Sequence, residues 1–148
     1  MTPKHKQLTM EYTIQMEPIP WKRAGCNFNR KSFFDLQKQE KTVCIIDLVR
    51  QHGEERMLVG PLSMKIVFYI PRIPSYRRRC ERTVSEVIIQ DEIFHHHRPD
   101  LDNYLKFILD TMQNTGVIFQ DDGQIAEIYS KKVVSDNPRT YILIQEMK

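Results

Sequence analysis

Alternation between apolar and polar side chains predicts two β-strands in the first half of the chain. Residues 8–18 include alternating apolar positions and end at Pro18, which is the pattern of a half-buried strand. Residues 62–70 are rich in apolar and aromatic side chains and are closed by Pro71. These two segments are expected to form strands, and the basic, polar stretch between residues 21 and 32 is expected to be a loop.

Apolar residues spaced three or four apart predict two helices. The first is expected within residues 33–52, ahead of a stop at Gly53, and the second is expected to start at Leu101 and to end near Gly116. Such a stripe is the face that a helix packs against the core. The first stripe consists of Phe34, Val43, Ile46 and Val49, and the second consists of Leu101, Leu105, Ile108, Leu109 and Met112.

The C-terminal part of the chain is predicted to return to β-structure. Residues 124–134 and 140–147 have strand patterns, and the turn sequence at 135–138 is expected to join them as a hairpin. The order of elements is then β-α-β-loop-α-β-β, which indicates an α+β fold with a mixed sheet. A chain of 148 residues, 41% hydrophobic and 28% charged, has the size and composition of a single globular domain over residues 1–148.

Composition excludes several classes of protein and favours a cytoplasmic location. The chain has no apolar run of about 20 residues, the length that crosses a membrane, so no membrane partner is expected. Its polar first residues do not resemble a secretory signal. The three cysteines, Cys26, Cys44 and Cys80, are odd in number and widely spaced, which favours reduced structural thiols over disulfides or a zinc ribbon.

Positive charge is concentrated in two places, although the net charge is only +3. Arginines gather in the segment 72–98, which is predicted to be a mobile, basic loop that contacts DNA, because arginine forks match phosphate geometry. A solvated loop without a ligand explains such a run equally well. The arginines are Arg72, Arg77, Arg78, Arg79 and Arg82, and a second basic stretch contains Lys22, Arg23, Arg30 and Lys31.

Four aspartates and one lysine carry the strongest chemical signal in the sequence. Asp100 and Asp102 stand at the start of the second predicted helix, Lys106 follows one turn later, and Asp121 and Asp122 lie in a turn after the helix. Clustered carboxylates repel one another unless a cation holds them, and Mg²⁺ or Mn²⁺ prefers such oxygen ligands. The pattern predicts a divalent-metal site that acts on a phosphodiester, where the lysine stabilises the transition state and no small-molecule cofactor is needed.

Each part of this pattern also has an ordinary structural explanation. An aspartate at a helix start is commonly a cap, and Asp-Asp-Gly is a common turn sequence. Asp102 and Lys106 are four residues apart and would also make a simple surface pair. An EF-hand is excluded, because counting from Asp100 the sixth and twelfth positions are Leu105 and Thr111.

The residues around the two acidic pairs resemble the RusA-type endodeoxyribonucleases, a family of Holliday-junction resolvases. The matching pattern is Asp-Leu-Asp-Asn-x-x-Lys, a helix that ends near Gly, an aromatic residue and Asp-Asp-x-Gln-Ile, which spans residues 100–125 here. The strand that follows, with Lys131 and Lys132, resembles the family's lysine-bearing strand, whereas the N-terminal half agrees only loosely. Pro99 departs from the best-known motif, which has a basic residue directly before the first aspartate, and the segment 72–97 is longer than in the compact version.

The resemblance implies a function and a role for each matching residue. Asp100, Asp102 and Asp122 would bind Mg²⁺, Lys106 would be catalytic, and Asp121 would support them. The family acts as a homodimer that nicks two strands of a four-way DNA junction symmetrically, so branched DNA and a second copy are the expected partners. The expected DNA contacts are Arg72, Arg77, Arg78, Arg79, Arg98, Lys131 and Lys132.

Two other functions stay open on the sequence alone. One is a catalytically silent module that binds branched DNA, although such a module gains nothing from carboxylates that face phosphate. The other is a metal-dependent nuclease for flap DNA, fork DNA or RNA, because contacts to the backbone carry little substrate identity. The residues 95–97, all histidines, favour a polar loop near DNA over a metal site, and Trp21 favours a packing anchor over a base-stacking platform.

Overall fold

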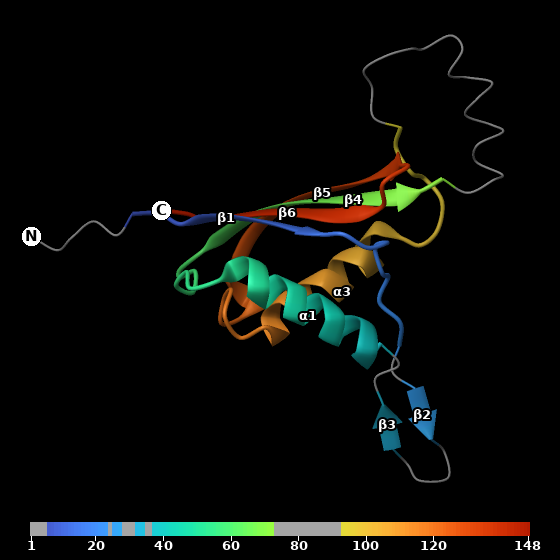
Figure 1. Ribbon diagram of the computed structural model, residues 1–148, viewed down its shortest axis with the longest axis horizontal. Coiled ribbons are helices and arrows are strands. Elements are labelled where there is room, and N and C mark those ends of the chain that lie inside the picture. The colour runs from blue at the N-terminus through green and yellow to red at the C-terminus, as the bar shows by residue number, and fades with distance from the viewer. Residues whose placement is uncertain (1–5, 24, 28–31, 35–36, 73–92) are drawn as a thin grey trace, which may run out of the picture.

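The computed structural model describes residues 6–23, 25–27, 32–34, 37–72 and 93–148. Within these residues two helices pack on one face of a four-stranded mixed sheet, which confirms the predicted α+β class (Figure 1). The strands of the sheet are β1 (Thr9–Ile14), β4 (Leu62–Pro71), β5 (Ile125–Ser135) and β6 (Arg139–Glu146), and the helices are α1 (Lys38–His52) and α3 (Leu101–Asn114). A separate hairpin consists of β2 (Gly25–Asn27) and β3 (Ser32–Phe34), and a 3-10 turn, η1 (Asp122–Gln124), precedes β5.

The strands lie in the order β1-β6-β4-β5, with β4 parallel to β5 and antiparallel to β6. The prediction that residues 124–134 and 140–147 form a hairpin was therefore wrong, because β4 lies between β5 and β6. Burial accounts for this order. Strand β4 buries Ile66 on one face of the sheet and Val67 on the other, so it suits a central position, whereas β5 leaves Tyr129 exposed.

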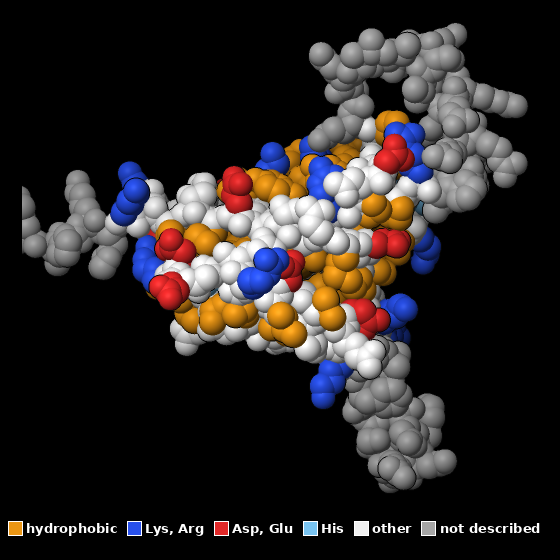
Figure 2. All heavy atoms as spheres, in the orientation of Figure 1, with side chains coloured by type: hydrophobic (Ala, Val, Ile, Leu, Met, Phe, Trp, Pro, Cys, Tyr) orange, Lys and Arg blue, Asp and Glu red, His pale blue; other side chains and the backbone are white. Residues whose placement is uncertain are grey.

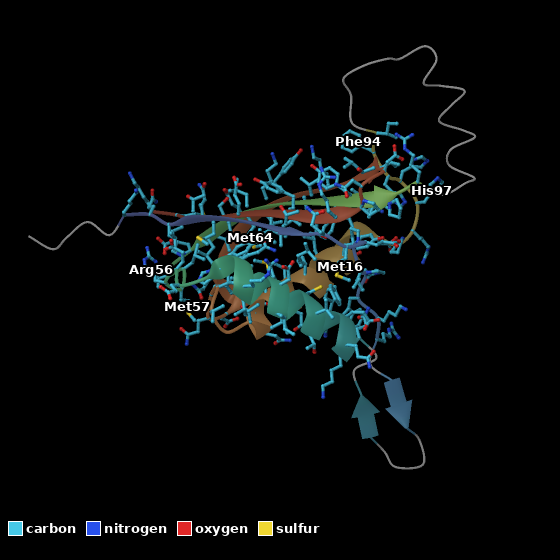
Figure 3. All side chains as sticks on the ribbon, in the orientation of Figure 1. Met16, Arg56, Met57, Met64, Phe94 and His97 are labelled. Carbon is cyan, nitrogen blue, oxygen red and sulfur yellow. The ribbon has the colours of Figure 1, made fainter. Side chains whose placement is uncertain are left out.

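The hydrophobic core fills the layer between the sheet and the two helices. Alternate residues of β4 and β6 point toward the helices, and among them Met64, Phe68 and Ile142 are almost fully buried. Figure 3 shows Met64 and Met16 in this layer. Helices α1 and α3 lie on the same face of the sheet, and the loops before and after α3 lie at opposite ends of that helix (Figure 1).

Helix α1 exposes three of the four apolar residues on which its prediction was based. Val43, Ile46 and Val49 are 57%, 64% and 38% exposed, and Figure 2 shows hydrophobic side chains on this surface. The buried face instead contains Leu48 and His52. The Nδ1 atom of His52 lies 2.7 Å from the Tyr12 hydroxyl of β1, a partner that helical periodicity does not reveal.

The boundaries of the helices agree with the predictions unequally. The first helix was predicted within residues 33–52. Helix α1 begins only at Lys38, and residues 33–34 belong to β3. The β2–β3 hairpin also occupies part of the segment 21–32, which was predicted to be a loop. Helix α3 begins and ends as predicted, with Gly116 at φ +68° just beyond it. No helix of the described residues is long and apolar enough to cross a membrane.

Most of the predicted basic loop lies outside the described residues. The described chain resumes at residue 93, where Phe94 forms an isolated bridge with Val133 and the His95 amide donates to the carbonyl oxygen of Lys132 at 3.0 Å. Residues 93–95 are therefore hydrogen-bonded to β5 and do not form a loop. The singled-out positions outside the described residues are Arg30, Lys31, Arg77, Arg78, Arg79, Cys80 and Arg82.

Candidate active site

Asp100 occupies the N-cap position of α3 without using its side chain for capping. Its backbone is extended (φ −70°, ψ 149°), and its carbonyl oxygen accepts hydrogen bonds from the amides of Asn103 and Tyr104. Within the described part of the chain, the Asp100 carboxylate makes no capping hydrogen bond. The side chain is exposed and available to a ligand, which argues against a purely capping role.

The turn after α3 gives Asp121 and Asp122 different roles. Asp121 is the N-cap of η1, and its carboxylate accepts a hydrogen bond from the Gly123 amide at 3.0 Å. The Gln124 side-chain oxygen accepts from the Asp121 amide at 3.1 Å, which completes a capping box, and the Gln124 side-chain nitrogen donates to the Gly60 carbonyl at 3.1 Å. Asp121 therefore shapes the turn, and its supporting role in a metal site stays a prediction.

Asp102, Lys106 and Asp122 line one hollow of about 430 Å³. Asp102 and Lys106 come from α3 and Asp122 comes from η1, so the hollow joins the two halves of the acidic motif. All three side chains are exposed. The other residues that line the hollow are Trp21, Leu105, Leu109 and Asp110. The fold thus brings together residues that lie far apart in the sequence.

Asp100 does not line this hollow, and its carboxylate lies close enough to Lys132 to act on it electrostatically. The Lys132 ammonium donates to the carbonyl oxygens of His97 at 2.8 Å and Pro99 at 2.7 Å, and the Arg98–Pro99 peptide bond is cis. Burial lowers the pKa of Lys132, and the Asp100 carboxylate opposes that shift. Lys132 therefore holds the segment that leads into α3, and its contact with DNA stays a prediction.

Neighbouring carboxyl groups perturb the ionisation of Asp122. A hydrogen bond with the Asp121 carboxyl group raises the pKa of Asp122 above its ordinary value, and desolvation and repulsion from Asp121 and Asp110 act in the same direction. The Gly123 amide, followed by the same carboxyl contact, lowers the pKa of Asp121. Asp121 is therefore the more acidic of the two carboxyl groups at this turn.

Of the residues in the hollow that were not assigned to a site from the sequence, Asp110 and Trp21 make specific contacts with lysine side chains. Asp110 pairs with the Lys41 ammonium of α1 at 2.8 Å. It follows Lys106 by four residues, as Lys106 follows Asp102, so helical spacing could have placed it on the same face. Trp21 packs against the hydrophobic core, as predicted, and its ring centroid also lies 3.5 Å from the Lys106 ammonium. Nothing in the sequence signals that contact.

The chemistry of the hollow suits a hard divalent cation. Carboxylate oxygens such as those of Asp102 and Asp122 are the ligands that Mg²⁺ and Mn²⁺ prefer, and Mg²⁺ is commonly held by one or two carboxylates with water and phosphate. Among the described residues, no three His, Cys, Asp or Glu side chains are already arranged to hold an ion. A cation would relieve the repulsion around Asp122. The three carboxylates that line the hollow, those of Asp102, Asp110 and Asp122, are therefore of the chemical kind that such an ion prefers.

The predicted DNA contacts that the structure describes do not all lie free on the surface. Arg98 is exposed, whereas the Arg72 guanidinium pairs with Asp136 at 3.1 Å. His95 is only 8% exposed, and its pairing with β5 differs from the expected polar loop. Figure 3 places Phe94 and His97 at the end of the sheet where β4 finishes.

Comparison with known proteins relates most of the chain to one family. The family described as endodeoxyribonuclease RusA matches residues 15–145. A protein of Bacillus subtilis (strain 168), named uncharacterized protein YqaN, is 27% identical over 143 residues, which cover 93% of this chain and 96% of that protein. The range matched by the family contains every residue that lines the hollow.

Proposed function

This chain belongs to the RusA endodeoxyribonuclease family, and we propose that it is a divalent-metal-dependent endonuclease that resolves four-way DNA junctions. Membership in the family supports an endonuclease that hydrolyses DNA. The observation that carries the finer proposal is the convergence of Asp102, Lys106 and Asp122 from two separate segments on one hollow. Two carboxylates and an ammonium are the groups that metal-assisted phosphodiester hydrolysis requires.

Asp102 and Asp122 would hold the metal, with Asp100 as a further ligand from the adjoining N-cap. When bound, Mg²⁺ or Mn²⁺ would supply Lewis-acid activation for the attack of water on phosphorus. The chain's own contribution is to keep the carboxylates in place. Asp121 and Gln124 do this for Asp122 through the hydrogen bonds of the capping box.

Lys106 would act on the phosphate itself. Its ammonium shares the hollow with both aspartates, and negative charge on the phosphoryl oxygens grows as water attacks. A fixed positive charge therefore stabilises the transition state more than the bound substrate. The bond from phosphorus to the 3′-oxygen breaks, and the products carry a 5′-phosphate and a 3′-hydroxyl.

The substrate would be branched DNA bound by a homodimer. Two identical subunits related by a two-fold axis present two equivalent hollows, and a four-way junction presents equivalent phosphates on two strands. Among the described residues, exposed Arg98 is the predicted DNA contact that stands nearest in sequence to Asp100. A silent DNA-binding module is less well supported, because unneutralised carboxylates would weaken binding to phosphate.

The proposal is tested by incubating the purified protein with end-labelled four-way junctions, flaps, forks, linear duplex and RNA hairpins, each with Mg²⁺ and with EDTA. We expect paired symmetric nicks on the junction, which disappear with EDTA and in Asp102→Asn. Glu54→Gln removes an exposed carboxylate outside the hollow and serves as the control. Cutting of flaps, forks or RNA alone would contradict the assignment of four-way junctions as the substrate. Binding without any cutting would favour the catalytically silent DNA-binding module.

A further inference from the structure

The ammonium of Lys106 rests on the face of the only tryptophan in the chain. Its Nζ atom lies 3.5 Å from the centroid of the Trp21 ring. A cation within about 6 Å of a ring centroid is attracted by the ring quadrupole, and tryptophan provides the strongest such attraction among side chains. The contact is therefore close enough to control where a flexible lysine side chain points.

Trp21 is itself held in place from two directions. Its backbone amide donates to the carbonyl oxygen of Asn103, in the first turn of α3, at 2.9 Å. The side chain of buried Gln37 then fixes both neighbours, because it donates to the Pro20 carbonyl at 2.7 Å and accepts from the Lys22 amide at 2.9 Å. The backbone of Trp21 is thus anchored to α3 and to the N-cap of α1.

The lysine has two competing partners on its own helix. Asp102 and Asp110 lie one turn before and one turn after Lys106, at the spacing that favours ion pairs on a helix. Among the residues that the structure describes, Lys106 nevertheless pairs with neither carboxylate, and Asp110 pairs with Lys41 instead. The indole face is the contact that the ammonium makes.

We propose that Trp21 is a positioning residue for Lys106. This inference rests on the proposed function. The indole keeps the ammonium in the hollow and away from Asp102 and Asp110, so the carboxylates stay available to a cation and the lysine stays available to phosphate. Without the ring, the ammonium would fold onto its helical neighbours and compete with the metal.

Metal binding measures this effect without any cutting. In Trp21→Leu, we expect the affinity for Mn²⁺, followed by the spin-resonance signal of the free ion, to fall about tenfold because Lys106 neutralises its neighbours. Adding Lys106→Ala to Trp21→Leu should restore the affinity, because the competing ammonium is gone. Trp21→Phe keeps an aromatic face and should bind the ion nearly as the natural protein does. Equal affinity in Trp21→Leu and the natural protein, or a loss that Lys106→Ala does not restore, would overturn the inference.

Fluorescence tests the contact itself, because all tryptophan emission comes from Trp21. Lys106→Met removes the ammonium and keeps the aliphatic chain, so we expect the emission of Trp21 to change in intensity. Unchanged emission would show that the ring and the ammonium do not meet in solution. If the protein without substitutions cuts no DNA, the proposed function is wrong. The emission and the Mn²⁺ titrations would still decide whether the ring positions the lysine.

The rate of cutting separates positioning from two other roles of the ring. In single-turnover nicking of a four-way junction, Trp21→Leu should be slower by about tenfold and Trp21→Phe nearly normal, while junction affinity stays close to normal. In a Lys106→Ala background, Trp21→Leu should add no further loss. A weaker junction affinity in both backgrounds would assign the ring to base stacking, and a slower rate in both backgrounds with normal junction affinity would assign it to packing alone.

Discussion

The backbone amide of Asp122 donates a hydrogen bond to the side-chain oxygen of Gln113 at 3.0 Å. Gln113 lies in the last turn of α3, so this bond ties the turn that carries Asp122 to the helix that carries Asp102 and Lys106. A residue outside the acidic motif thereby joins the two halves of the hollow.

Removing that tie should weaken the proposed metal site without unfolding the protein. Gln113→Ala leaves the Asp122 amide without its partner, and we expect the dissociation constant for Mn²⁺ to rise about tenfold, the lower end of the range for residues that orient metal ligands. Gln120→Ala is the matched control, because Gln120 is an exposed glutamine on the same turn. Equal effects of the two variants in a Mn²⁺ titration would reject the role of Gln113.

Lys106→Ala should slow cutting and spare metal binding. Because the ammonium acts on the phosphate in the proposed mechanism, we expect the single-turnover nicking rate to fall about 10²-fold at saturating Mg²⁺. The Mn²⁺ affinity should stay the same or rise slightly. If Lys106→Ala nicks as fast as the protein without substitutions, the lysine has no part in the mechanism. A large loss of Mn²⁺ affinity would show that its role is structural.

Lys131 and Lys132 are adjacent but should respond differently to the same change. Lys132→Met loses the hydrogen bonds to His97 and Pro99, and we expect the free energy of unfolding to fall by roughly 1–2 kcal/mol. Lys131→Met should weaken junction binding, as the loss of a phosphate contact would. Urea unfolding together with junction titration distinguishes the two roles, and normal stability of Lys132→Met would contradict the structural one.

The pair of Arg56 and Glu146 should make stability depend on pH in the acid range. Arg56 and the amides of Leu8 and Val59 all donate to the Glu146 carboxylate. The hydrogen bond from Arg56, the largest cause, lowers the pKa of Glu146 from 4.5 to about 2. The carboxylate is ionised in both folded and unfolded chains above pH 4.5, so its contribution is complete there and is lost as the pH falls toward 2.

Urea unfolding of Glu146→Gln checks this contribution. At pH 6 we expect the variant to be less stable than the natural protein by roughly 2 kcal/mol, because bonds to a charged, buried acceptor are lost. The difference in the free energy of unfolding should shrink as the pH is lowered from 4.5 toward 2. A difference that does not change with pH would show that the ionisation of Glu146 has no part in stability.

The sequence predicted the elements of this fold better than their pairing. Periodicity placed β1, β4 and α3, because each carries its apolar residues in a regular pattern. It did not predict that β4 lies between β5 and β6, since pairing depends on which strand buries both of its faces. It also favoured the exposed side of α1, because Val43 and Ile46 look like core residues while His52 does not.

The candidate site was predictable wherever chemistry follows from close spacing. Asp102 and Lys106 are one helical turn apart, and Asp122 follows the same helix, so their meeting could be expected. The contacts of Trp21 with Lys106 and of Lys41 with Asp110 cross between elements that are distant in the sequence. Such contacts depend on how the helices pack, which the pattern of a single chain does not specify.

The most direct test of the whole account is the nicking rate of Asp122→Asn on a four-way junction, measured beside its junction affinity. Asp122 contributes to the hollow from the turn, and the substitution removes a metal ligand while nearly preserving shape. We expect nicking to fall by about 10³-fold or more at saturating Mg²⁺ with junction affinity almost unchanged. Asp47→Asn, which changes a carboxylate of α1 outside the hollow, should behave as the natural protein. Nicking at the natural rate, or a parallel loss of nicking and binding, would contradict the assignment of this hollow as the metal-dependent cutting centre.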